Sequence, residues 1–203
     1  DETLKKINKY KNKILKIISE KDNGIYYAMN KGIKLAKGDV IVFCNSGDFF
    51  YKNSLKKVIK LFKNFKYDFV FGTVIRNYKR GGKIHKHGFN FQRMLYNFDF
   101  ATSHTTGFFL KKNVYKEIGL YDTKFKCSAD YDLYYRLYKG KYKGGSTKKH
   151  QVIGNVASGG YSSTFTFLDH IAEESKIRLK NKQNFIFVLI IFVNAFIKKL
   201  FKT

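Results

Sequence analysis

A short polar segment that ends in a carboxylate is the first chemically suggestive feature of the chain. It is Asn45-Ser46-Gly47-Asp48, and it follows the apolar, β-branched run at residues 40–44. Such a run predicts a strand buried on both faces of a parallel sheet. Ligands of open α/β sheets bind beyond the carboxyl ends of the strands, so we expect Asp48 to face a substrate. The alternative is that Asp48 begins a turn or caps the next helix.

Two further carboxylate pairs stand at predicted element boundaries. Glu20 and Asp22 lie in a polar loop, and Asp130 and Asp132 lie at the start of a predicted helix. A hard divalent cation takes oxygen ligands and needs only one or two carboxylates when substrate phosphates supply the rest, which makes Asp48 a candidate metal ligand. Asp130 is a candidate general base, with helix capping as the alternative.

The elements that must position these side chains alternate between helix and strand. Strand patterns cover residues 14–18, 40–44, 68–74, 108–110 and 151–156, a hairpin covers 76–86, and helical patterns cover 1–12, 25–37, 55–65, 89–100, 114–118, 129–138, 165–182 and 185–201. The strand–helix–strand order at the start predicts a βαβ unit with parallel strands. The predicted fold is therefore α/β, with a mostly parallel sheet flanked by helices and a C-terminal helical tail.

Hydrophobic periodicity predicts which helical faces are buried. In the first helix Leu4 and Ile7 are expected to face inward, and in helix 55–65 one face carries Leu55, Val58, Ile59 and Phe62. Cys44 is expected to be a buried thiol within its strand. The second cysteine, Cys127, is far away in sequence, so no zinc-type spacing is present.

The composition is strongly basic. The 203 residues contain 40 Lys and Arg against 15 Asp and Glu, a formal net charge of +25. This charge favours polyanionic partners such as phosphorylated substrates or an anionic membrane surface, or it reflects a general compositional bias. Because the lysines are spread along the chain and no compact Arg-rich segment stands out, the pattern argues against a nucleic-acid-binding domain.

The length suits one domain with a tail, and we divide the chain into a main domain at residues 1–163 and a helical tail at residues 164–203. The apolar run at 185–193 is shorter than the ~20 residues of a membrane-spanning helix. It is predicted to lie in a membrane interface with lysines at the headgroups, or else to pack on the domain or a partner subunit. The N-terminus has no apolar signal segment and reads as if the chain began partway through a fold.

A series of short motifs follows one another across residues 1–163: Glu20-Lys21-Asp22-Asn23-Gly24-Ile25-Tyr26, Ala28-Met29-Asn30-Lys31-Gly32-Ile33, Ala36-Lys37-Gly38-Asp39, Asn45-Ser46-Gly47-Asp48, His104-Thr105-Thr106-Gly107-Phe108-Phe109, Gly119-Leu120-Tyr121-Asp122, Ala129-Asp130-Tyr131-Asp132-Leu133, Arg136-Leu137 and Gly159-Gly160-Tyr161-Ser162. In this order they resemble the family 2 glycosyltransferases of the Rossmann-like GT-A fold, and in particular the bacterial capsular and exopolysaccharide branch of colanic-acid type. Each motif is weak alone, and their shared order is specific. Asp1-Glu2-Thr3 resembles the end of a family segment, so the family's first strand, first helix and second strand are expected to be missing from this chain.

The resemblance implies an inverting transferase that moves a sugar from a nucleoside-diphosphate sugar, usually UDP-linked, to a glycan or lipid-linked acceptor. Asp48 would coordinate Mg²⁺ or Mn²⁺ on the diphosphate, and Asp130 would be the base, with Asp132 as the second choice. The candidate donor-site residues are Glu20, Asp22, Gly24, Asn30, Asn45, Ser46, Gly47 and His104, the last on a segment that approaches the acceptor side. The expected location is the cytoplasm, peripheral at the inner face of the membrane. The alternative is a non-catalytic family member that binds nucleotide sugar or glycan.

Some positions depart from the family pattern. Asn45 and Gly47 stand where an Asp-x-Asp motif would offer more carboxylate, so metal binding depends mainly on Asp48. Met29 replaces an Arg of many relatives, and Tyr27 replaces an Asp that is usual in this branch. The changes at Met29 and Tyr27 affect which side chains are expected to recognise the sugar donor.

Overall fold

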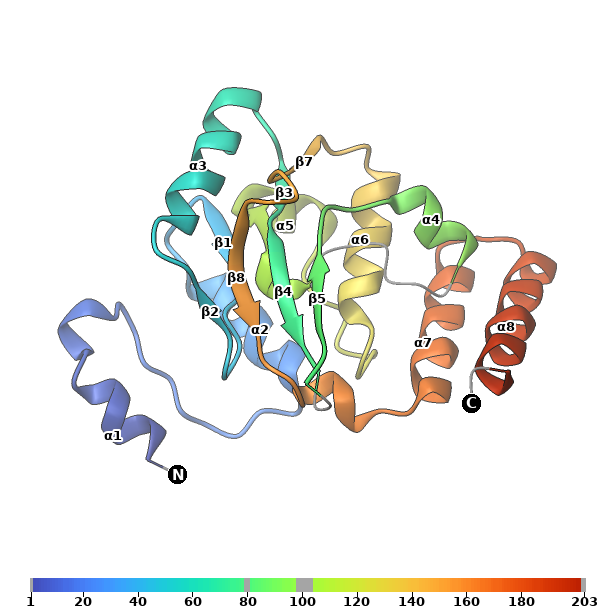
Figure 1. Cartoon of the computed structure of the whole chain (residues 1–203), viewed down its shortest axis with the longest axis horizontal. Helices are drawn as coiled ribbons and strands as arrows, with labels where there is room; N and C mark the ends of the chain where they lie inside the picture. Colours follow the sequence, from blue (N-terminus) through green and yellow to red (C-terminus); the bar gives the residue numbers. More distant parts are fainter. Residues whose placement is uncertain (1, 79–80, 98–103, 202–203) are drawn as a thin grey trace.

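The computed structural model has two small β-sheets at its centre with helices packed around them (Figure 1). It describes residues 2–78, 81–97 and 104–201. The helices are α1 (Thr3–Asn8), α2 (Ile25–Leu35), α3 (Ser54–Phe65), α4 (Phe91–Tyr96), α5 (Lys112–Ile118), α6 (Ala129–Lys139), α7 (Phe167–Lys180) and α8 (Phe185–Leu200), with 3₁₀ turns η1 (Lys11–Lys13), η2 (Thr105–Gly107) and η3 (Tyr161–Thr164). The strands are β1 (Val40–Val42), β2 (Phe49–Phe50), β3 (Phe69–Phe71), β4 (Thr73–Asn77), β5 (Lys83–Lys86), β6 (Phe108–Lys111), β7 (Gly144–Ser146) and β8 (Val152–Val156).

The strands pair in two sheets of mixed direction. The first has the order β1-β6-β3-β7 and the second the order β2-β8-β4-β5. The α/β class with flanking helices is confirmed, but the expectation of mostly parallel pairing is wrong: in the described part of the chain four of the six pairings are antiparallel. The reason is that β6 lies between β1 and β3 and runs opposite to both. Strands β1 and β3 of the first sheet are therefore parallel to each other but not adjacent.

The first sheet is buried on both faces because its strands alternate between two cores. Phe69 and Phe71 of β3 point into a core shared with α2, α5 and α6, whereas Val70 between them points into a second core shared with α3 and β8. All three side chains are at most 1% exposed. This two-sided burial explains why the strands read as continuous apolar runs without alternation.

Gly72 allows the chain to pass from the first sheet into the second. Its N–H donates to Gly107 O of η2 at 2.7 Å. A Cβ at this position would lie 2.1 Å from Cδ1 and 2.6 Å from Cγ1 of Ile153. The single strand expected at residues 68–74 is consequently two strands, β3 and β4, broken at this glycine.

Several sequence predictions near the N-terminal half need correction. Residues 14–18 form no strand, and Leu15 is 68% exposed. Helix α1 buries none of its residues, so Leu4 does not face inward. Within the described residues β1 is an edge strand that pairs only with β6, and no strand pairs with 14–18, so this segment and α1 before it stay outside both sheets.

Other predictions are confirmed in part. Helix α3 buries Val58 and Phe62, whereas Leu55 and Ile59 are exposed because the side chains of the second core reach only one narrow stripe of the helix. Cys44 lies just beyond β1 and is exposed, so its expected burial is wrong. The hairpin is present as β4 and β5, with residues 79–80 outside the described part, as are residues 98–100 of the helix expected at 89–100.

The last two helices, α7 and α8, are the longest of the described helices and pack against each other. Helix α7 is fixed by the buried Arg178, which donates to Met94 O at 2.6 Å and Asn97 O at 2.7 Å, and by Ile177, which packs in the first core. Helix α8 lies along α7 (Figure 1). None of the helices in the described residues combines the length and the apolar character that crossing a bilayer would require.

The crossing at Gly72 yields a stability prediction. We expect Gly72→Ala to lower the free energy of unfolding by about 2 kcal/mol, because the new methyl group overlaps Ile153 in a packed core. Gly82→Ala is the matched control, since a Cβ there meets nothing within 4 Å. Urea unfolding followed by circular dichroism measures both, and equal midpoints for the two variants would contradict the close approach.

Candidate functional site

The turn after β1 holds Asp48 in place. The Asp48 N–H donates to Asn45 O at 3.0 Å, which closes a tight turn, and Gly47 has a φ of 83° that favours glycine. A Cβ on Gly47 would lie 2.9 Å from Cβ of Ala157. The turn is therefore pressed against the segment that follows β8, and Gly47 permits that contact.

The Asp48 carboxylate accepts hydrogen bonds from three separate parts of the chain. Oδ2 accepts from the Thr106 hydroxyl and from Asn45 Nδ2, the latter at 3.5 Å. Oδ1 accepts from the backbone N–H of Ala157 at 2.9 Å. These donors belong to the β1 turn, to η2 and to the end of β8, so the carboxylate marks the point at which the two sheets meet.

The Asp130 carboxylate lies in the first turn of α6 and also accepts several hydrogen bonds. Its donors are the Tyr26 hydroxyl at 3.3 Å, the Thr105 hydroxyl at 3.4 Å and the Tyr131 N–H at 3.0 Å. Desolvation by burial raises the pKa of Asp130 to about 6, while the hydrogen bonds from Tyr131 and Tyr26 oppose that rise. A carboxyl group with this pKa can both hold and release a proton near neutral pH.

The two carboxylates are brought together by one turn of the chain. Thr105 and Thr106 are consecutive residues of η2, and their hydroxyls bind Asp130 and Asp48 respectively. Asp48 and Asp130 are 82 residues apart in sequence (130 − 48 = 82) yet share this turn. Their roles remain predictions, but the structure places both carboxylates at one site.

His104 lies directly before this turn and is held as a neutral imidazole. Burial lowers the pKa of His104 to about 4, and the positive charges of Arg76 and Lys86 contribute, whereas Asp48 acts in the opposite direction. Its Nδ1 accepts from the Thr106 N–H at 3.3 Å, which assigns the ring proton to Nε2. A neutral His104 with an N–H at Nε2 is a hydrogen-bond donor beside the site at neutral pH.

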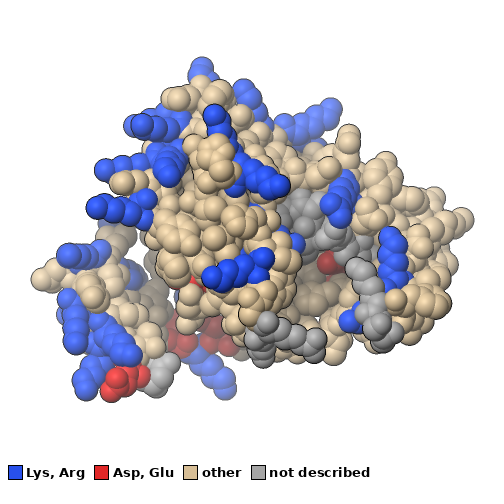
Figure 2. Space-filling view, viewed as in Figure 1, with Lys and Arg blue, Asp and Glu red and all other residues tan. Residues whose placement is uncertain are grey.

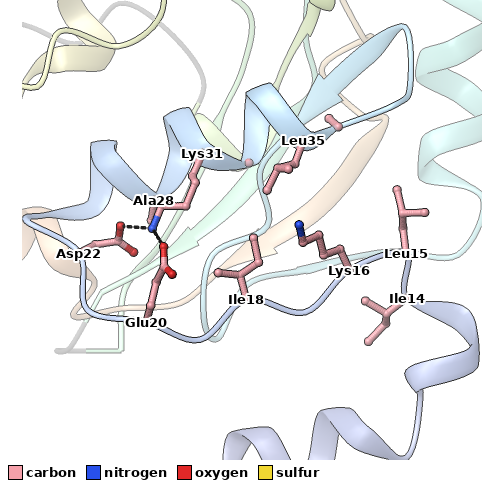
Figure 3. A pocket seen from close by; sticks show the side chains of 11 residues that line it. Ile14, Leu15, Lys16, Ile18, Glu20, Asp22, Ala28, Lys31 and Leu35 are labelled. Carbon is pink, nitrogen blue, oxygen red and sulfur yellow. Dashed lines mark hydrogen bonds and ion pairs between the residues drawn. The ribbon is translucent and has the colours of Figure 1, made fainter.

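Glu20 and Asp22 lie apart from this cluster and pair with Lys31 of α2. The Lys31 Nζ contacts Glu20 and lies 2.7 Å from an Asp22 oxygen, as Figure 3 shows. These three residues form one end of a pocket of about 450 Å³ between α2 and the extended segment before it. Its remaining lining is mostly apolar: Ile14, Leu15, Lys16, Ile18, Ala28, Gly32, Leu35 and Ala36.

Two other candidates have structural partners. The Asn30 side chain donates to Tyr121 O at 2.8 Å and accepts from Tyr121 N at 2.9 Å, so it anchors the loop after α5. Asp132 is fully buried and forms ion pairs at 2.9 Å with Arg136 and with Lys180. The structure thus places Asp132 in an ion-pair network between α6 and α7, away from the hydroxyls that bind Asp48 and Asp130.

The remaining candidates belong to loops around the site. Gly24 has a φ of 132° and precedes α2, and a Cβ there would lie 3.8 Å from the Tyr161 hydroxyl. Ser46 is exposed at the tip of the turn that ends in Asp48. Sequence reasoning gave no role to Tyr26, Thr105 or Thr106, although each lies in a motif quoted for the family resemblance. The hydroxyl groups of these three residues, within motifs that also carry the candidate carboxylates or precede them, were the signal that could have identified them as hydrogen-bond donors to the site.

The site offers few oxygen ligands for a cation. In the ranges that the structure describes, no three His, Cys, Asp or Glu side chains cluster as a metal-binding group. Asp48, with Asn45 next to it, is the carboxylate at the strand end. One carboxylate suffices for Mg²⁺ when a diphosphate and water supply the other oxygens, so this donor set fits a substrate-borne cation and not a dedicated metal cage.

Solved structures with a similar architecture identify the fold. S. aureus TarS residues 1–349 in complex with UDP-GlcNAc superposes with a TM-score of 0.67 at 16% identity, covering 96% of this chain and 60% of that chain. The same TarS segment without ligand gives a TM-score of 0.64 at 17% identity. At this identity the likeness shows the fold, which is the GT-A glycosyltransferase fold.

The family follows from the sequence comparison. The model for "Glycosyl transferase family 2" matches residues 1–119, and the chain belongs to this family. The PGL/p-HBAD biosynthesis glycosyltransferase of Mycobacterium tuberculosis (strain H37Rv) is 28% identical over 122 residues, and its Mycobacterium bovis BCG counterpart gives the same values. The match covers 58% of this chain and 44% of those proteins.

The raised pKa of Asp130 predicts a pH-dependent effect on stability. Because the folded state binds this proton more tightly than the unfolded chain, folding loses stability as pH rises from about 4 to about 6 and does not regain it above. We expect Asp130→Asn to stabilise the protein by about 1–2 kcal/mol at pH 7.5 and to change little at pH 4, measured by thermal unfolding.

Asp132→Asn is the matched control on the same helix. It removes the carboxylate from two ion pairs, so it should destabilise the protein by at least about 2 kcal/mol at pH 7.5. A destabilising effect of Asp130→Asn at pH 7.5 would mean that its hydrogen bonds outweigh the cost of burying its charge.

Proposed function

We propose that this chain carries the catalytic centre of an inverting glycosyltransferase. It transfers a sugar from a UDP-linked donor to a glycan or lipid-linked acceptor at the cytoplasmic side of a membrane, and it belongs to the capsular and exopolysaccharide branch. The observation that carries the proposal is the shared η2 turn, on which Thr105 and Thr106 bind Asp130 and Asp48. Membership of the family and the UDP-GlcNAc bound by TarS support the reaction class and the donor.

Asp130 would act as the general base. The acceptor hydroxyl attacks the anomeric carbon from the face opposite the diphosphate, the new C–O bond forms as the sugar–phosphate bond breaks, and the configuration inverts. The acceptor proton passes to the Asp130 carboxylate. A pKa of about 6 suits this task, because the group is mostly ionised at pH 7 yet basic enough to take the proton. Tyr26 and Thr105 would orient the carboxylate through their hydrogen bonds.

Asp48 would hold the diphosphate end of the donor through Mg²⁺ or Mn²⁺. Its oxygens are fixed by Thr106 and Ala157, so the carboxylate needs little reorganisation when the donor binds. When bound, the cation would neutralise charge on the diphosphate leaving group. Neutral His104, next to Thr106, would add an N–H donor without adding a charge that competes with the cation.

The metal proposal predicts the effect of Asp48→Asn. We expect this isosteric change to lower turnover at least 100-fold and to abolish the Mn²⁺ dependence of UDP binding, because the amide cannot replace the carboxylate as a charged ligand. Hydrolysis of a panel of UDP-sugars and calorimetric titration with UDP, each with and without Mn²⁺, measure these effects.

Asp68→Asn is the control for Asp48→Asn. It also removes a partly buried carboxylate, but one that pairs with Lys111 at the far end of β3. It should leave Mn²⁺-dependent binding unchanged. If Asp48→Asn kept full turnover and metal dependence, the assignment of Asp48 would be wrong.

The base proposal predicts a different signature for Asp130→Asn. Turnover should fall 10²–10⁴-fold with little change in UDP affinity, because a base acts in the transition state. Wild-type turnover should fall as pH drops below about 6, where Asp130 becomes protonated. Thr105→Val removes a donor that favours the ionised carboxylate, so it should move this midpoint to higher pH. Loss of UDP binding in Asp130→Asn would instead identify a pocket residue.

A further inference from the structure

A continuous apolar face covers the outer side of α8. Six of its side chains are between 41% and 66% exposed: Ile186, Leu189, Ile190, Val193, Phe196 and Ile197. Figure 2 shows the edge of the molecule formed by this helix as largely uncharged, whereas Lys and Arg crowd the region of α3. A contiguous apolar surface of this kind marks an interaction site.

The helix has a sharply divided surface. At about 100° per residue the six side chains fall within an arc of about 120°. On the opposite side Val188 and Ile191 are buried against the protein, next to α7. Lys198 and Lys199 lie about 140° and about 120° from the centre of the apolar arc, on the half of the helix that carries Val188 and Ile191. A broad apolar face from which the lysines are absent is typical of a helix that lies in a membrane interface.

We propose that this face of α8 docks on an anionic lipid bilayer, with the helix axis parallel to the membrane plane and the apolar side chains below the headgroups. Charge decides the occupant: the chain has a formal net charge of +25, which anionic lipid attracts. A second copy seated on the same face would bring equal positive charge against it. Because α8 has 16 residues and is only about 24 Å long, it is shorter than the ~30 Å hydrocarbon core and lies on the surface.

The docked orientation would bring the candidate site close to the membrane. Nζ of Lys199, near the end of α8, lies 6.0 Å from the ring centre of Phe167, the first residue of α7. One turn further along α7, the His170 ring Nε2 lies 3.2 Å from Ser162 O of η3. The hydroxyl of Tyr161 in the same turn would lie 3.8 Å from a Cβ on Gly24, two residues before the Tyr26 that binds Asp130. Helix α8 thus ends on the side of the molecule that carries Asp130. Access to a lipid-linked acceptor would follow, and this consequence alone rests on the proposed function.

Vesicle binding tests the docking directly. Large vesicles made of equal parts phosphatidylglycerol and phosphatidylcholine are sedimented with the wild-type protein and with Ile186→Glu/Val193→Glu, which places two charges at the centre of the apolar arc. The control is Leu55→Glu/Ile59→Glu on α3, whose side chains are 44% and 48% exposed and which changes the charge equally. We expect the α8 variant to bind at least tenfold more weakly than wild type and the α3 variant to bind nearly as wild type.

A fluorescence experiment tests the depth of insertion. The chain contains no Trp, so a single introduced Trp reports on one position. With Phe196→Trp we expect a blue shift and quenching by brominated lipid when vesicles are added. With Phe65→Trp on α3, at 48% exposure in the native side chain, we expect neither.

Specific results would overturn the proposal. Equal vesicle binding by the α8 and α3 variants would show that net charge alone causes it. A wild-type protein that sediments as a dimer without vesicles, and as a monomer with Ile186→Glu/Val193→Glu, would identify a second copy as the occupant. No sugar donor enters these measurements, so their failure leaves glycosyl transfer untouched, and a failure of the transfer assays leaves membrane docking untouched.

Discussion

The pair of hydrogen bonds from Thr105 and Thr106 is the contact on which the arrangement of the site depends. The same turn also joins the two sheets, because Gly107 O accepts the N–H of Gly72 where the chain crosses from β3 to β4. The position of the two carboxylates is therefore tied to the packing of the sheets. Thr106 and Gly107 are both buried at this junction. A shift of η2 would therefore disturb the fold and the site together.

Asp130 and Asp132 show how two carboxylates on one helix acquire different properties. Residues two positions apart point to different sides of a helix, so Asp130 faces Tyr26 and η2, whereas Asp132 faces Arg136 and Lys180. Burial raises the pKa of Asp130 despite its hydroxyl partners, whereas Asp132 is paired with two cations. The ionised Asp130 carboxylate lowers the stability of the folded protein because it is buried, and it is also the carboxylate suited to proton transfer. Such a trade-off between stability and activity is common at functional sites.

The basic character of the chain is divided unevenly. Lysines crowd α3, whereas the outer face of α8 is apolar and the lysines of that helix lie in its last turn, away from this face. Next to the site, His104 is neutral because burial lowers its pKa, and the positive charges of Arg76 and Lys86 lower that pKa further. The positive charge therefore lies mainly on the protein surface, where it can attract anionic phosphates and lipids, and not within the site.

Local patterns were sufficient for the helices and for the order of the motifs. Helix α2, helix α6, the β4–β5 hairpin and the α/β class follow from periodicity and turn residues, and the position of Asp48 in the turn after β1 follows from an apolar run that ends at Cys44. These features depend on neighbours in sequence, whose side-chain periodicity is visible in the chain itself.

Contacts between distant residues were decided only by the tertiary structure. No pattern in residues 40–44 or 69–71 indicates that β6 lies between β1 and β3 and is antiparallel to both. No pattern shows that residues 14–18, although apolar, stay outside the sheets. Likewise, the sequence placed Asp130 first and Asp132 second as candidate bases at one helix start, and no local pattern showed how their environments differ. Their environments come from η2, α2 and α7, which lie far away along the chain, and burial and hydrogen bonding by distant segments are what set the properties of a carboxylate.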